Sequence, residues 1–188
     1  MSINVVNTSL PGVLLIETTA YTDERGFFME TYSQRKYKQA GIDACFVQDN
    51  CSQSQRGTLR GLHYQLQHPQ GKLIYVTNGE IFDIVVDIRF GSPTFGKWYG
   101  SHLSSQNHHQ LYIPQGFAHG FYVLSDIAEV TYKCTDFYTP GDEYGIFWAD
   151  PDIDVKWLME RPILSEKDAI LPELRKVPKE HLPIYPCG

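Results

Sequence analysis

Two of the seven histidines stand in sequence contexts that suit catalysis or ligand binding. His63 ends the run Arg60-Gly61-Leu62-His63, and His119 ends the tight-turn spacing Pro114-x-Gly116-x-x-His119. Histidine can transfer a proton near neutral pH or bind a metal through a ring nitrogen, so both roles are open to this pair. The remaining five lie among polar or loop residues, where solvent exposure is the ordinary expectation: His68, His102, His108, His109 and His181.

Strict strand alternation separates Arg60 from His63. Successive side chains of a β-strand point to opposite faces, which groups Arg60 with Leu62 on one face and Gly61 with His63 on the other. A β-bulge, which inserts one extra residue into a strand, removes such a separation. The sequence therefore leaves open whether Arg60 and His63 serve one site.

The spacing that ends at His119 resembles the second motif of the cupin superfamily, small double-stranded β-helix barrels with an interior active site. A metal-binding cupin carries His-x-His and then a Glu in its first motif, whereas the matching stretch here reads His63-Tyr64-Gln65 and continues with Gln70 and Lys72. A metal commonly needs three or four protein ligands, so two histidines predict no metal site. The ammonium of Lys72 agrees, because it opposes a bound cation and favours an oxyanion or phosphate.

Many short strands must position these groups. The 188 residues suit one domain, and 26 Gly and Pro residues (15 and 11) are spread along the chain as turn residues. This pattern predicts an all-β barrel or sandwich. The strand-like runs are 13–17, 27–32, 46–53, 59–64, 98–103, 110–113, 118–124 and 129–137.

A predicted β-hairpin is the clearest local unit, with arms at 72–77 and 80–89 joined by Asn78-Gly79. Asn-Gly suits a two-residue type I′ turn. On the second arm apolar residues such as Phe82 and Ile84 alternate with Asp83, which predicts a polar face toward the barrel interior.

Helices are predicted to be few, short and peripheral. Ser33 suits an N-cap for a helix over 34–40, and Ser165 suits one for a short helix that includes Asp168. From about residue 171 onward the chain holds four prolines, which predict an irregular tail.

Composition excludes several classes of function. A formal charge of −6 argues against general nucleic-acid binding, so an anionic ligand needs a local basic cluster. No apolar run approaches the roughly 20 residues of a membrane span, and no signal peptide is evident, so we expect a soluble, cytoplasmic protein. The cysteines lack Cys-x-x-Cys spacing and are expected to be reduced thiols: Cys45, Cys51, Cys134 and Cys187.

Taken together in order, the motifs resemble one cupin family over nearly the whole chain, the dTDP-4-dehydrorhamnose 3,5-epimerases of dTDP-L-rhamnose biosynthesis. This resemblance implies a single domain over 1–188 and epimerisation at C3 and C5 of a dTDP-linked 4-keto-6-deoxy sugar, without metal or cofactor. It also implies a homodimer and a place in carbohydrate synthesis such as that of lipopolysaccharide O-antigen. The motifs are 23–30, 48–50, 60–65, 70–72, 92–96, 114–121 and 164–168.

Carried onto this sequence, the resemblance implies His63 as proton acceptor, Asp168 as its carboxylate partner and Tyr132 as proton donor. It implies a further set of substrate contacts, which are Arg25, Glu30, Gln48, Asn50, Arg60, Lys72, His119, Glu143 and Lys167.

The chemistry of these residue types suits the same reaction. Inversion beside a ketone needs a base, a stabiliser for the enolate oxygen and an acid on the opposite face. A carboxylate that orients His63 makes it a better base, and Asp83 is the alternative partner to Asp168. Lys72 supplies charge for the enolate, and the phenol of Tyr132, with a reference pKa of about 10, can donate a proton.

A basic cluster is needed to hold the diphosphate. Arg25, Arg60 and Lys167 are predicted to form it, since arginine suits bidentate phosphate contact. Three alternatives stay open: a mono-epimerase acting at C3 or C5 only, a metal-dependent cupin, and a non-catalytic sugar-binding cupin.

Overall fold

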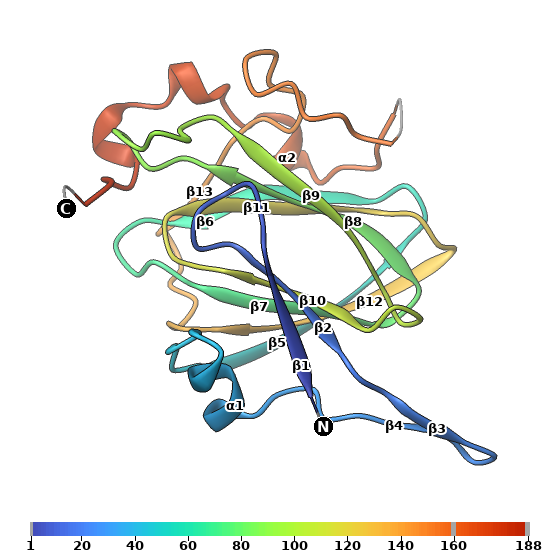
Figure 1. The fold of residues 1–188 in the computed structure, drawn as a ribbon. Coiled ribbons are helices and arrows are strands. Elements are labelled where there is room, and N and C mark those ends of the chain that lie inside the picture. Colours follow the sequence, from blue (N-terminus) through green and yellow to red (C-terminus); the bar gives the residue numbers. More distant parts are fainter. Residues whose placement is uncertain (1, 159–160, 187–188) are drawn as a thin grey trace.

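The computed structural model describes residues 2–158 and 161–186, whose strands form two facing antiparallel sheets (Figure 1). The predicted all-β class is confirmed. The six-stranded sheet has the order β1 (Ile3–Asn7), β2 (Leu14–Thr18), β10 (His109–Ile113), β7 (Lys72–Asn78), β12 (Ile127–Cys134) and β5 (Gln48–Gln55). The five-stranded sheet has the order β13 (Glu143–Gly145), β6 (Leu59–Gln65), β11 (Phe117–Val123), β8 (Glu80–Asp87) and β9 (Trp98–Ser104).

The predicted hairpin at Asn78-Gly79 is wrong. Strand β7 pairs with β10 and β12, while β8 pairs with β9 and β11, so the chain crosses from one sheet to the other at this point. Gly79 has φ +80°, and a Cβ there would lie 2.1 Å from the carbonyl oxygen of Ile127. Nearly every residue of β8 is buried, so long-range pairing overrides the local preference of Asn-Gly for a hairpin.

Apolar side chains fill two layers around the five-stranded sheet. The alternation predicted for β8 is confirmed, because Ile81 and Val85 pack between the sheets while Phe82 and Ile84 pack on the outer face. Leu174 of the C-terminal segment is buried against that outer face. Asp83 is on the same face of β8 as Ile81 and Val85 and therefore points to the interior, as the alternation predicted.

The C-terminal segment lies over the five-stranded sheet, at the top of Figure 1. It contains the short helix α2 (Glu166–Ala169) and two 3₁₀ turns, η1 (Leu174–Lys176) and η2 (Lys179–His181). Ser165 caps α2 as predicted, since its Oγ accepts a hydrogen bond from the backbone N–H of Asp168 at 3.1 Å. This hydrogen bond fixes the backbone position from which the Asp168 side chain extends.

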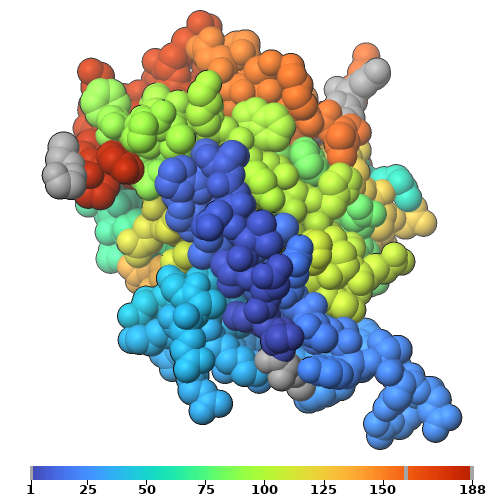
Figure 2. Space-filling view, viewed as in Figure 1, coloured from blue at the N-terminus to red at the C-terminus, as the bar shows by residue number. Residues whose placement is uncertain are grey.

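The secondary structure between residues 21 and 40 differs more from the predicted one. Helix α1 (Gln34–Gln39) follows Ser33, whose side chain makes no capping hydrogen bond. The strand predicted over 27–32 ends at residue 28, as β4 (Gly26–Phe28), which pairs with β3 (Tyr21–Asp23). This small hairpin projects from the body at the lower right of Figures 1 and 2.

No helix within 2–158 or 161–186 is both long and apolar enough to cross a membrane.

Candidate active site

A β-bulge brings Arg60 and His63 to the same face of β6. His63 pairs with His119 and Arg60 pairs with Phe121, so two residues of β6 lie opposite the single residue Gly120. One of the two, Gly61, has φ +121°, and a Cβ there would lie 2.6 Å from the Cα of Gly120. The bulge thus removes the separation that strict alternation predicts between the Arg60 and His63 side chains.

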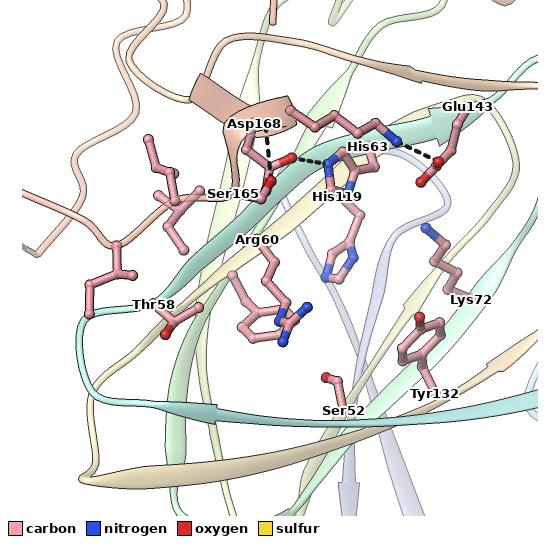
Figure 3. Close-up of a pocket in the computed structure, with 15 residues that line it drawn as sticks. Ser52, Thr58, Arg60, His63, Lys72, His119, Tyr132, Glu143, Ser165 and Asp168 are labelled. Carbon is pink, nitrogen blue, oxygen red and sulfur yellow. Dashed lines mark hydrogen bonds and ion pairs between the residues drawn. The ribbon is translucent and has the colours of Figure 1, made fainter. Parts of the chain in front are cut away.

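Both side chains line a cavity of about 450 Å³ between the sheets (Figure 3). A second cavity of about 190 Å³ adjoins it, because four residues line both: His63, Lys72, Tyr132 and Glu143. The larger cavity is also lined by Arg60, His119, Lys167 and Asp168, and the smaller by Gln48 and Asn50.

On one wall, His63 forms a pair with Asp168 of α2. Nε2 of His63 lies 2.6 Å from Oδ1 of Asp168, whose side chain is only 4% exposed. Burial alone would raise the pKa of the Asp168 carboxyl, but hydrogen bonds from His63, Gly61 and Ser165 hold it below its usual value. The carboxylate stays ionised and accepts the Nε2 hydrogen, which leaves the lone pair on Nδ1 of His63.

The opposite wall holds an ammonium and a phenol. Lys72 on β7 and Tyr132 on β12 belong to the six-stranded sheet and point toward His63 and Asp168 (Figure 3). Burial lowers the pKa of the Lys72 ammonium and raises the pKa of the Tyr132 phenol. The phenol therefore keeps its proton to higher pH than an exposed tyrosine.

A second histidine and carboxylate pair lies deeper between the sheets. Nε2 of His119 is 2.8 Å from Oδ2 of Asp83, which is fully buried. Asp83, the alternative partner proposed for His63, therefore pairs with His119 instead. Burial raises the pKa of the Asp83 carboxyl, while His119 and the charge of Lys72 oppose that rise.

Polar side chains extend the site along β5 and across its mouth. The Nε of Arg60 donates to Oγ of Ser54 at 2.9 Å, and Nε2 of Gln48 donates to Oδ1 of Asn50 at 3.0 Å. At the mouth, Lys167 forms an ion pair with Glu143. Burial would raise the pKa of the Glu143 carboxyl, but Lys167 holds it below its usual value.

Two predicted contacts lie away from the cavity. Arg25, in the β3–β4 turn, pairs with Asp23 and has an 86% exposed side chain. Glu30 pairs with Lys36 of α1 at 2.6 Å. Of the three residues of the predicted basic cluster, only Arg60 and Lys167 line the cavity. Arg25 does not, because the β3–β4 hairpin that carries it points outward.

Sequence reasoning missed Ser52 and Ser54, which continue the polar face of β5 beyond Gln48 and Asn50. All four recur at every second residue, and alternation along β5 was the signal that could have found them. In the parts of the chain that the structure describes, no three His, Cys, Asp or Glu side chains are grouped to hold a metal ion.

Comparison with known proteins gives matches over most of the chain. A family model described as dTDP-4-dehydrorhamnose 3,5-epimerase matches residues 7–176. A protein of that name from Shigella flexneri is 53% identical over 167 residues, which is 88% of this chain and 92% of that protein. Another from Neisseria gonorrhoeae is 54% identical over 166 residues, although this chain spans only 51% of its length.

Solved structures agree with these matches. The crystal structure of dTDP-6-deoxy-D-glucose-3,5-epimerase from Legionella pneumophila Philadelphia 1, in complex with dTDP-4-keto-L-rhamnose, has a TM-score of 0.96 and 50% sequence identity. The likeness covers 99% of this chain and 100% of that one. It therefore extends over every strand that carries a cavity residue.

Proposed function

The chain belongs to the dTDP-4-dehydrorhamnose 3,5-epimerase family, and on that premise we propose that it converts dTDP-4-dehydro-6-deoxy-D-glucose into dTDP-4-dehydro-L-rhamnose. It is an isomerase of dTDP-L-rhamnose biosynthesis, with the cupin-type jelly-roll fold of its family. The reaction inverts C3 and C5, the two carbons that flank the C4 ketone.

The observation that carries this proposal is the placement of base and acid on facing sheets. His63 comes from the five-stranded sheet, and Tyr132 comes from the six-stranded sheet across the cavity. Inversion needs a proton to leave one face of the sugar and another to arrive on the opposite face. A flat enolate held between the two walls meets this requirement.

Each proton transfer is assigned to a named group. The basic nitrogen of His63 takes the proton from carbon, and the electron pair of the broken C–H bond moves onto the C4 oxygen as an enolate. Lys72 stabilises that oxygen, in the manner of an oxyanion hole. The phenol of Tyr132 protonates the opposite face, after which His63 loses its proton to water and the tyrosinate regains one.

The ionised Asp168 holds the His63 ring and stabilises the imidazolium as it forms, which is the role of aspartate in a catalytic triad. We assign the diphosphate to Arg60 and Lys167 at the cavity mouth. The remaining polar contacts to substrate are assigned to Gln48, Asn50, His119 and Glu143.

Deuterium labelling tests the whole assignment. With dTDP-4-dehydro-6-deoxy-D-glucose in D₂O, we expect NMR of the product to show deuterium at both C3 and C5. Label at one carbon alone would establish a mono-epimerase, and binding without any exchange would establish a non-catalytic cupin. Loss of exchange on adding a chelator would establish a metal-dependent enzyme.

We also propose that the enzyme acts as a homodimer. On the β3–β4 hairpin, which projects from the body (Figure 2), Tyr21, Phe27 and Phe28 are each more than half exposed. A partner subunit would bury them and bring Arg25 and Glu30 near a nucleotide site, which accounts for their position outside this cavity. Light scattering should give twice the chain mass of 21.5 kDa, and a monomer at micromolar concentration would refute the proposal.

Residues 1–188 are proposed to act as one catalytic domain in the cytoplasm, with the tail from about 171 held against the outer sheet face by Leu174 and Leu182. The product of the enzyme, dTDP-4-dehydro-L-rhamnose, would be the precursor of the rhamnose in surface polysaccharide such as O-antigen. Cell fractionation and rhamnose analysis of polysaccharide from a deletion strain would test this placement.

A further inference from the structure

Asp83 carries a buried carboxylate oxygen with no partner. Within residues 2–158 and 161–186, only Ser52 Oγ and Asp83 Oδ1 are buried side-chain polar atoms without a hydrogen bond. Oδ2 of Asp83 is paired with His119, so the unpaired oxygen belongs to a group that is otherwise held in place. An unpaired buried carboxylate oxygen is costly and calls for a functional explanation.

Lys72 shows the complementary condition. It is half-buried in the cavity wall, and in the same described ranges no carboxylate lies within ion-pair distance of its Nζ. Strands β7 and β8 belong to the two facing sheets, so Lys72 and Asp83 are carried by opposite sheets. Asp83 itself lines neither cavity, but its partner His119 lines the same cavity as Lys72. The buried carboxyl with an unpaired oxygen and the ammonium without a close partner are thus linked through His119.

We propose that Asp83 is a positioning residue that acts through two neighbours, as the hydrogen-bond partner that orients His119 and as the counter-charge that keeps Lys72 protonated. This inference rests on the proposed role of Lys72 as stabiliser of the enolate oxygen. It gives Asp83 a function distinct from that of Asp168, which serves the base.

The electrostatics agree with this arrangement. Burial lowers the pKa of Lys72, and the charge of Asp83 is one of the influences that oppose the fall. Other titratable groups face Lys72 from the strands around it: Glu143 of β13, Cys134 and Tyr132 of β12, His63 of β6 and His119 of β11. Of the two carboxylates that raise the Lys72 pKa, Glu143 is already paired with Lys167, whereas Asp83 has a free oxygen.

The pH profile of Asp83→Asn tests the proposal. Without the negative charge, Lys72 should lose its proton at lower pH, so the alkaline limb of kcat should move by about one pH unit or more toward acid. KM should stay within about threefold, because Asp83 lines neither cavity and the amide oxygen of the asparagine can still accept the hydrogen bond from His119. An alkaline limb that coincides with that of the wild type would overturn the inference.

Two comparisons separate this role from a structural one. Asp150→Asn removes another buried carboxylate, one that accepts hydrogen bonds from the backbone N–H groups of Asp152, Ile153 and Leu174. It should lower Tm without moving the alkaline limb. If Asp83→Asn does not fold, Asp83→Ser makes the same comparison, because a small neutral side chain leaves room for water.

A double-mutant cycle gives a readout independent of activity. Lys72→Met should raise Tm more in the Asp83→Asn background than in the wild type, because the ammonium has lost its counter-charge there. Equal increases would show that the two residues do not interact. Absence of deuterium exchange in the wild type would instead reject the proposed function, and full activity of Lys72→Met would reject only the role of Lys72.

Discussion

His63→Ala should lower kcat for epimerisation by about 10³-fold or more while leaving affinity for the nucleotide sugar within a few-fold. General-base catalysis contributes about 10²- to 10⁴-fold, and His63 lines the cavity on the wall facing Tyr132, with its ring held by the ionised carboxylate of Asp168. The variant should fail to exchange at C3 as well as at C5, because one base serves both carbons. Deuterium uptake measures the loss of catalysis, and titration calorimetry with the nucleotide sugar measures the affinity.

His102→Ala provides the matched control. Nδ1 of His102 lies 2.8 Å from Oε1 of Glu80, so this histidine also has a carboxylate partner, but both side chains lie on the surface. Its loss should leave kcat unchanged. If His63→Ala kept exchange at either carbon, the base for that carbon would have to be sought elsewhere in the cavity.

Local patterns in the sequence were sufficient for much of the site. Ser165 caps α2 because a serine hydroxyl can accept the hydrogen bond of a free helix N–H, and that cap needs no distant contact. The alternation along β8 likewise placed Asp83 on the interior face. The partner of His63 was a choice between Asp83 and Asp168, which only the folded position of α2 decides.

Features that depend on distant pairing were not predictable. Asn78-Gly79 has the composition of a hairpin turn, yet the pairing of β8 with β11 makes it a crossing between sheets. The bulge at Gly61 places an extra residue of β6 opposite Gly120; Gly61 permits the positive φ that the bulge needs, but the register itself is set by the pairing of β6 with β11. Arg25 was expected in the cavity, but the β3–β4 hairpin that carries it projects away from the body.

These differences explain why the residue types were easier to predict than their grouping. Chemistry limits which types of side chain can serve as base, acid and oxyanion stabiliser, and the family resemblance singled out His63, Tyr132 and Lys72 among the residues of those types. Whether they meet depends on how two sheets face each other, which is settled by packing between strands far apart in the chain.

Lys72→Met should lower kcat by about 10²- to 10³-fold, which is the usual effect of removing one preorganised donor to a developing oxyanion. The same change should raise the free energy of unfolding by about 1 kcal/mol or more at neutral pH, because it removes a poorly paired ammonium from the cavity wall. For a chain of this size, that gain corresponds to a rise in Tm of about 2–4 °C. A residue kept for catalysis would thus be shown to oppose folding.

The pH dependence of this stability gain gives the sharper test. Burial places the pKa of Lys72 in the folded protein below its unfolded value of about 10.4, so the folded state binds this proton more weakly. Wild-type stability should therefore rise relative to that of Lys72→Met as pH rises through the folded pKa toward 10.4, and the advantage of the variant should shrink. Thermal unfolding at pH 7 and pH 10 measures the difference.

Lys133→Met is the control, because Nζ of Lys133 lies 2.9 Å from Oδ2 of Asp49 and its removal should bring no gain in Tm. A gain of equal size at both pH values, or in both variants, would show that the stabilisation comes from the added apolar surface rather than from relief of a buried charge.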